Sequence, residues 1–422
     1  MSSPSPPVGI PGPAGSGRAC GILLHPTSLP GPHGIGDLGP AAYGFLDWLA
    51  EAGQSLWQVL PLGPTGYGDS PYASFSSFAG NPLLVSPEVL ASQGLVDKRD
   101  LGDALPPAGG RVDYGAVIAW KIPLLRRAAM RFLSEATSEL RRKYQDFCSA
   151  ESWWLDDFAT FTSIKALHPG AWNRDWPAGL ALRDSGELAR MRQDRAREMD
   201  VERAVQFFFF EQWGALRAEA ARRGIAVIGD LPIFVALDSS DVWAHRQLFR
   251  LDDRGNPTVV SGVPPDYFAA TGQLWGNPLY DWEAMARDGF RFWTRRIRSA
   301  RRMVDLVRID HFRGFAASWA VPAGSATAAT GRWEEVPGRA LFETLEKELG
   351  HLPIIAEDLG VITPDVVALR ERFGFPGMRV QQFAFDRNEA GALGADNRFL
   401  PHNHAADSVV YTGTHDNDTT AG

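Results

Sequence analysis

Three short apolar segments in the second half of the chain each end abruptly in charged side chains. Residues 303–309 lead into Asp310, residues 352–356 into Glu357, and residues 408–413 into a polar segment that contains Asp416. Mostly apolar runs of this length are typical of buried strands. In a parallel α/β barrel the carboxyl ends of the strands meet at one face, where the catalytic groups are placed. The pattern therefore predicts that the three acids converge on one site.

The rest of the chain alternates between strand-like and helix-like segments, which favours a (β/α)₈ TIM barrel over an open doubly wound sheet. We expect parallel strands at residues 21–24, 56–62, 225–229, 303–309, 352–356, 378–385 and 408–413. Residues 81–86 are also apolar, but no helix precedes them, and we interpret them as a loop extension. Only six residues follow Asp416. We therefore expect a barrel that lacks its C-terminal strand and helix and leaves two strand edges unpaired.

Composition shifts along the chain predict its domain organisation. Residues 1–17 are rich in Ser, Pro and Gly and are interpreted as a disordered tail. Residues 18–422 would form the catalytic barrel. Within it, about 87–222 carries helical patterns and no strong strand, so we expect a mainly helical insertion. The Gly-, Pro- and Asp-rich stretch at about 236–280 is expected to form active-site loops.

Charge and cysteine content exclude several classes of protein. The formal net charge of −8 argues against a nucleic-acid or anionic-membrane partner. The two cysteines, Cys20 and Cys148, have neither the number nor the spacing of a disulfide framework or a metal site, which fits a reducing compartment. No apolar run is long enough to span a membrane, and residues 1–17 have no secretory-signal pattern. We expect a cytoplasmic protein, and the sequence carries no signal for an oligomeric state.

Carboxylic acids at neighbouring strand ends suit the cleavage of a glycosidic bond. One acid protonates the leaving oxygen while a second attacks or stabilises the anomeric carbon. Alternatively, each acid could cap a helix or pair with an arginine. The polar companions at these strand ends, Arg308, His311 and His415 among them, favour a shared catalytic site.

Other chemistries are weakly supported by the sequence. The pairs Asp310-His311 and His415-Asp416, and the H-x-H spacing of His402 and His404, could suggest metal ligands. The two histidines lie in a Pro- and Asn-rich loop, however, and no Cys or His cluster completes a site. Phosphate-cradling glycine motifs and a G-x-S-x-G serine motif at a strand end are absent from the sequence. We expect neither a metal nor a cofactor.

Two loops combine aromatic rings with hydrogen-bonding side chains, as carbohydrate sites do. Residues 264–278 contain Tyr267, Phe268 and Trp275 together with acid and amide groups, and residues 67–72 have the same character. Rings can pack against the C–H faces of sugars while polar groups bind the hydroxyls. Packing of these loops on their own scaffold is the alternative.

Six motifs resemble those of the amylomaltase (disproportionating enzyme) family of 4-α-glucanotransferases, a branch of the α-amylase-type barrels. They are GDSPY at 68–72, GDLP at 229–232, GQLWGNP at 272–278, RIDHFRG at 308–314, AEDLG at 356–360 and THDN at 414–417. The resemblance runs in the expected order from about residue 21 to the last residue.

The resemblance implies a role for each motif residue. Asp310 would be the nucleophile, Glu357 the acid/base, and Asp416 the group that holds the 2- and 3-hydroxyls of the distorted sugar. Arg308 would orient Asp310. The remaining substrate-binding residues would be Tyr72, Asp230, Asp266, Phe268, Gln273, Trp275, His311 and His415.

The resemblance also predicts the activity: a retaining 4-α-glucanotransferase that moves α-1,4-glucan segments between maltooligosaccharides through a covalent glucosyl-enzyme. The alternatives are a hydrolase or branching enzyme of the same barrel class, or a non-catalytic α-glucan-binding barrel. The proposed roles require Asp310, beside Arg308, to stay ionised, and Glu357 to have a raised pKa in a partly dry cleft.

Overall fold

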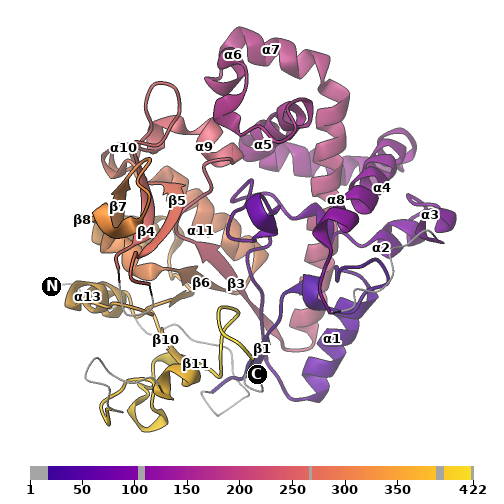
Figure 1. The fold of residues 1–422 in the computed structure, drawn as a ribbon. Coiled ribbons are helices and arrows are strands. Elements are labelled where there is room, and N and C mark those ends of the chain that lie inside the picture. Colours follow the sequence, from indigo (N-terminus) through magenta and orange to yellow (C-terminus); the bar gives the residue numbers. More distant parts are fainter. Residues whose placement is uncertain (1–17, 103–109, 266–268, 386–393, 420–422) are drawn as a thin grey trace.

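The computed structural model describes residues 18–102, 110–265, 269–385 and 394–419. The predicted tail at residues 1–17 lies outside the described residues. Figure 1 shows a central set of strands with helices packed around it, and a group of long helices on one side.

Parallel strands form the centre of the fold. Five of them pair in the order β1-β2-β3-β6-β9, and β10 pairs with β11. Their bounds are β1 Gly21–Leu23, β2 Leu56–Gln58, β3 Ala226–Pro232, β6 Leu306–Asp310, β9 Ile354–Ala356, β10 Gly377–Val380 and β11 Ser408–Tyr411. Each falls in or overlaps one of the seven ranges predicted from the sequence. Residues 81–86 contain no strand: Pro82–Leu84 is a 3-10 turn capped by the Asn81 side chain, as expected of a loop extension.

One backbone and one side-chain hydrogen bond link the two parallel groups. The Ala356 backbone N–H, at the end of β9, donates to Pro376 O at 2.9 Å, just before β10. The buried Tyr411 hydroxyl of β11 donates to Gln58 Oε1 of β2 at 2.7 Å. Strand β10 therefore lies beside β9, and β11 contacts β2.

The structure also contains an antiparallel sheet that was not predicted from the sequence. It has the order β5-β4-β7-β8, with bounds β4 Val259–Val263, β5 Gln273–Pro278, β7 Ala317–Pro322 and β8 Arg332–Glu335. The sequence predicts only loops at 236–280, so that prediction is wrong for β4 and β5. Much of β5 is exposed, and its apolar residues show no regular spacing. Strand β4 pairs with β5 and also with β7, which lies much later in the sequence. Pairing of that kind leaves no local signal.

Thirteen α-helices lie within the described residues. They are α1 Pro40–Glu51, α2 Pro87–Ser92, α3 Lys98–Gly102, α4 Tyr114–Glu135, α5 Ser138–Leu167, α6 Ala178–Ala181, α7 Ser185–Asp194, α8 Ala196–Arg222, α9 Ser240–Ala244, α10 Trp282–Arg287, α11 Arg291–Met303, α12 Gly338–Leu349 and α13 Pro364–Arg372. In the described part of the segment at 87–222, regular structure is helical apart from short turns. The sequence predicts one helix at 282–302, but the structure has two, α10 and α11, because Gly289 and Phe290 adopt positive φ values of 70° and 53°.

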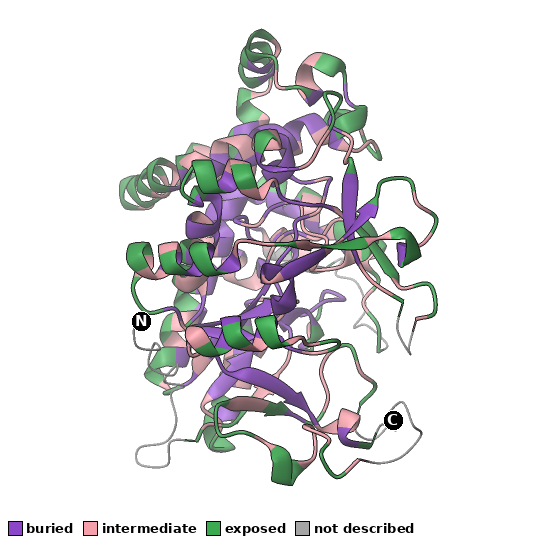
Figure 2. Cartoon of the chain, turned by 90° about the vertical axis from the view of Figure 1, so that its left-hand side faces the viewer, coloured by how far each residue is buried: buried purple, intermediate pink, exposed green. Residues whose placement is uncertain are grey.

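Apolar side chains bury the strands between the helices. In Figure 2 the strands of the centre are mostly buried, whereas outer helices show exposed faces. Trp57 of β2, Ile309 of β6 and Ile354 of β9 have no exposed area. Phe209 of α8 is equally buried, so the long helices share this core. Against this core, charged side chains at the strand ends are held in fixed positions. None of the described helices is long and apolar enough to cross a membrane.

Candidate active site

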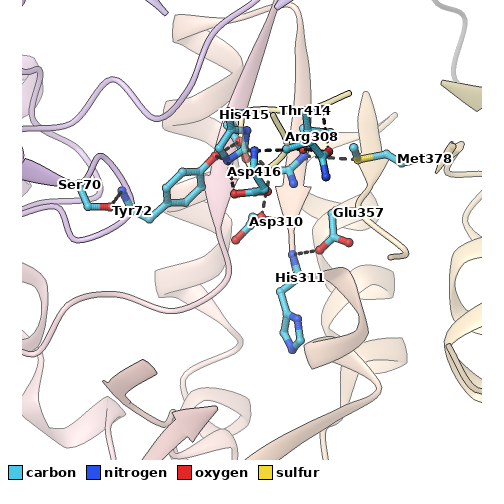
Figure 3. Close-up of polar contacts among 12 residues, drawn as sticks. Ser70, Tyr72, Arg308, Asp310, His311, Glu357, Met378, Thr414, His415 and Asp416 are labelled. Carbon is cyan, nitrogen blue, oxygen red and sulfur yellow. Dashed lines mark hydrogen bonds and ion pairs between the residues drawn. The ribbon is translucent and has the colours of Figure 1, made fainter. Parts of the chain in front are cut away.

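Arg308 is the centre of the polar cluster at the strand ends (Figure 3). It lies two residues before Asp310 on β6, and side chains two apart on a strand project to the same side. Its Nη1 donates to Asp230 Oδ1 and Oδ2 at 2.8 and 2.7 Å, and lies 3.0 Å from Asp310 Oδ1. Asp230 is the register partner of Arg308 on the neighbouring strand β3. Parallel pairing therefore places one guanidinium between two carboxylates.

Tyr72 extends this cluster toward His415. Its hydroxyl lies 2.7 Å from Asp230 Oδ2 and 2.8 Å from His415 Nε2. The phenol has one proton, and Asp230, paired with Arg308, is an acceptor; the Tyr72 hydroxyl therefore donates to Asp230 and accepts from His415 Nε2–H. Burial lowers the pKa of His415, so its ring is neutral in this arrangement. The two rings stack with centroids 5.3 Å apart.

Glu357 directly follows β9 and is held by two backbone N–H groups. His311 N donates to Oε2 and Leu359 N donates to Oε1, each at 2.7 Å. His311 has a left-handed backbone (φ 53°), which turns the chain sharply after Asp310 and aims its N–H at Glu357. The residue next to one acid thus fixes the position of the other.

Burial raises the pKa values of both Asp310 and Glu357. It raises the pKa of Asp310 to about 7, with the negative charges of Asp230 and Glu357 adding to the shift and Arg308 opposing it. Burial also raises the pKa of Glu357, as predicted, although Arg308 and the two N–H groups oppose the rise. The sequence predicts that Asp310 stays ionised beside Arg308, and the rise in its pKa through burial acts against ionisation. Arg308 is also shared with Asp230, whose side chain has 0% exposure.

A cleft of about 690 Å³ opens in front of the acids and collects most of the predicted site residues. Those lining it are Tyr72, Gln273, Trp275, Arg308, Asp310, His311, Glu357, His415 and Asp416. Asp416 lies at the rim: its side chain is 70% exposed, and Oδ1 is 3.3 Å from His415 Nε2. Asp230 lies behind the cleft, with both oxygens engaged. Asp266 and Phe268 lie outside the described residues.

Aromatic side chains form one wall of the cleft. Trp275 is 39% exposed, and its Nε1 donates to Gln273 Oε1 at 3.1 Å. Its indole meets the His311 ring edge to face, with centroids 4.7 Å apart. The His311 imidazole points away from the acids in Figure 3, and burial lowers its pKa to about 3. A neutral, aromatic wall of this kind suits an uncharged sugar.

Among the residues that line the same cleft without a role predicted from the sequence are Arg313, Trp333 and Val361. Arg313 is part of the RIDHFRG motif but was given no role. Trp333 lies between charged residues after a glycine, in a polar setting where an exposed ring is a recognisable signal.

The histidines considered as metal ligands have other partners. His402 Nε2 lies 3.4 Å from Ala395 O, and His404 Nε2 lies 2.9 Å from Phe399 O. Among the residues that the structure describes, His, Cys, Asp and Glu side chains form no group of three or more suited to a metal ion. The charge balance of the site comes from Arg308.

Comparisons with known proteins agree with this fold and cleft, and they identify the family to which the chain belongs. Residues 24–422 match the family described as 4-alpha-glucanotransferase, and the chain belongs to that family. The resemblance predicted from the six motifs is confirmed.

Individual relatives are similar over almost the whole chain. A 4-alpha-glucanotransferase of Thermus thermophilus is 55% identical over 408 residues, which is 96% of this chain and 79% of the relative. The corresponding protein of a Synechocystis strain is 49% identical, over 96% of this chain and 80% of the relative. Among solved structures, an amylomaltase from Streptococcus agalactiae in complex with acarbose superposes with a TM-score of 0.89 at 40% identity, covering 95% of this chain and 80% of that one.

Proposed function

We propose that this protein is a retaining 4-α-glucanotransferase that transfers segments of α-1,4-glucan from one maltooligosaccharide to another. One observation carries the proposal: Asp310, paired with Arg308, shares a cleft with Glu357, which two backbone N–H groups hold in place. Membership of the 4-alpha-glucanotransferase family supports the same activity.

In the first step, the Asp310 carboxylate attacks the anomeric carbon of the donor. The glycosidic C–O bond breaks, and its oxygen takes the proton of Glu357 as it leaves. A protonated Glu357 can still accept the N–H groups of His311 and Leu359, because each carboxyl oxygen keeps a lone pair. The product is a glucosyl ester on Asp310, with Glu357 as the carboxylate.

In the second step, the 4-hydroxyl of an acceptor sugar attacks the same carbon. Glu357 takes the hydroxyl proton, and the ester bond to Asp310 breaks, which restores both acids. Two inversions at one carbon retain its configuration. Transfer wins over hydrolysis when the acceptor reaches the ester before water does, and a largely aromatic cleft wall favours that outcome.

Asp416 and His415, at the rim, are assigned to the hydroxyls of the sugar at the point of cleavage. Tyr72 lies beneath that sugar, and Gln273 and Trp275 bind its neighbours. Asp230 acts by positioning Arg308 and Tyr72. We further propose that the seven parallel strands belong to a TIM-type barrel in which residues at about 87–222 are a helical insertion.

Incubation with maltotriose separates the proposed function from its alternatives. A transferase produces glucose together with longer oligomers while the total number of reducing ends stays constant. A hydrolase raises that number, a branching enzyme forms α-1,6 linkages that proton NMR detects, and a binding protein leaves maltotriose unchanged. Any of the last three results would overturn the proposal.

The pH dependence of kcat/KM tests the roles of the two acids. Asp310 must be ionised to attack, so activity should rise with pH through an acid limb near the pKa of about 7 that burial gives it. Glu357 must be protonated, so its raised pKa sets the alkaline limb, along which activity falls as Glu357 loses its proton.

The Glu357→Gln variant tests which limb of the pH profile belongs to Glu357. In Glu357→Gln, an α-maltosyl fluoride donor needs no proton for its leaving group, so the alkaline limb should vanish. The acid limb should move to lower pH, because the charge of Glu357 helps to raise the pKa of Asp310. An unchanged alkaline limb with this donor would assign the acid role to another group.

A further inference from the structure

One exposed tryptophan at the cleft has no assigned role. Trp333 lies on β8, an edge strand of the antiparallel sheet, and is 38% exposed. It lines the same cleft of about 690 Å³ as Asp310 and Glu357. Its neighbours in sequence, Arg332 and Glu334, are charged. A large aromatic side chain exposed among polar residues beside a catalytic cleft is a candidate ligand contact.

The Trp333 ring is fixed on two sides. The guanidinium of Arg313 covers it, with the guanidinium carbon 3.7 Å from the ring centroid. On β7, Trp319 is its register partner, and the two rings meet edge to face at 5.1 Å. Trp319 is itself anchored, since its Nε1 donates to Ala328 O at 2.8 Å. A ring held in this way loses little freedom when a ligand binds.

Arg313 contacts the Trp333 ring and lies close in sequence to Asp310, and its side chain binds the loop that follows Glu357. It belongs to the 3-10 turn Phe312–Phe315, which begins two residues after Asp310, and it is only 6% exposed. Its Nη1 donates to Val361 O at 2.6 Å, in the loop that follows Glu357. Trp333 is thus held by a side chain from the turn that follows the nucleophile.

We propose that Trp333, held by Arg313, is a specificity-determining residue that stacks on a glucosyl unit remote from the cleaved bond. The part of the indole left uncovered by Arg313 and Trp319 offers an apolar surface to the C–H face of the sugar. Val361, which is 57% exposed, extends that surface. The site thereby favours long α-1,4-glucans over short ones. This inference rests on the proposed function for its substrate class.

Binding of maltoheptaose and maltotriose by titration calorimetry tests the proposal. The measurement uses an Asp310→Asn background, in which the bound sugar is not consumed. Replacing Trp333 by leucine keeps an apolar side chain on the edge strand but removes the flat ring. We expect the affinity for maltoheptaose to fall about tenfold, and that for maltotriose to change by less than about twofold. Trp48→Leu is the matched control, because Trp48 is 51% exposed, stacks on Phe45, and is not part of the cleft lining.

Each outcome decides the question. A selective loss for maltoheptaose, with the melting temperature unchanged and the Trp48 control normal, supports a remote sugar contact. An equal loss for both sugars, or no loss, overturns it, because an effect on the fold or on the acids would not depend on chain length. If the parent protein fails to convert maltotriose, the proposed function fails separately, and the calorimetric comparison still decides the role of Trp333.

Discussion

The Asp310→Asn variant is expected to lose essentially all transferase activity, by about 10⁴-fold or more in kcat, as when a covalent nucleophile is removed. The amide keeps the size and much of the hydrogen bonding of the carboxylate, but it cannot form the ester. Binding of maltooligosaccharides should stay nearly intact, because the lost interaction belongs to the transition state. Initial rates of maltotriose disproportionation, with a separate binding measurement, check both halves of the prediction.

One control and one comparison variant sharpen this result. Asp253→Asn replaces an exposed aspartate outside the cleft lining and should retain ordinary activity. Trp275→Ala should weaken use of the substrate mainly through KM, since the proposed stacking of its ring on a sugar would act in the ground state as well. Residual transfer by Asp310→Asn above a hundredth of the parent rate would remove Asp310 from the nucleophile role.

The Arg308→Leu variant is expected to have the largest effect on stability. The side chains of Arg308 and Asp230 are 3% and 0% exposed, so the substitution leaves a buried carboxylate without its partner. Breaking a buried pair in this way costs about 3–5 kcal/mol of unfolding free energy. Urea unfolding at pH 7 measures the loss of stability. The value of kcat should fall as well, because Asp310 loses the cation that orients it.

A second variant tests the cause of this loss. A double variant, Asp230→Leu with Arg308→Leu, should recover part of the lost stability, because no buried charge remains. Equal stability of the single and double variants would argue against an unpaired Asp230 as the cause.

Particular elements show how far the sequence alone could predict this fold. Strands β2, β3, β6, β9 and β10 are buried along most of their length, so their apolar runs are continuous and easily recognised. Strands β4 and β5 escaped prediction because their partners and exposed residues leave no periodic pattern. The break at Gly289 between α10 and α11 was missed as well, since a single glycine within a periodic segment also fits an unbroken helix.

The site was predictable to a similar degree. The acids and Arg308 could be predicted because they lie at the ends of apolar runs. The order of the six motifs along the chain supports the same prediction. The pKa of Asp310 could not be predicted, because it depends first on burial and then on the charges of Arg308 and Asp230, which meet only when β3 pairs with β6. The position of Trp333 depends in the same way on Arg313 and on the antiparallel sheet.

The contact between Tyr72 and His415 joins residues 343 positions apart, and the one between Gln58 and Tyr411 joins residues 353 apart. Closing loops of this length is entropically costly and slow, so local helices and neighbouring strands have time to form first. The polar cluster is consequently complete only after β2 and β11 have come together. During refolding, the return of activity should lag behind the return of helical circular dichroism, which makes catalysis a reporter of the final assembly of the chain.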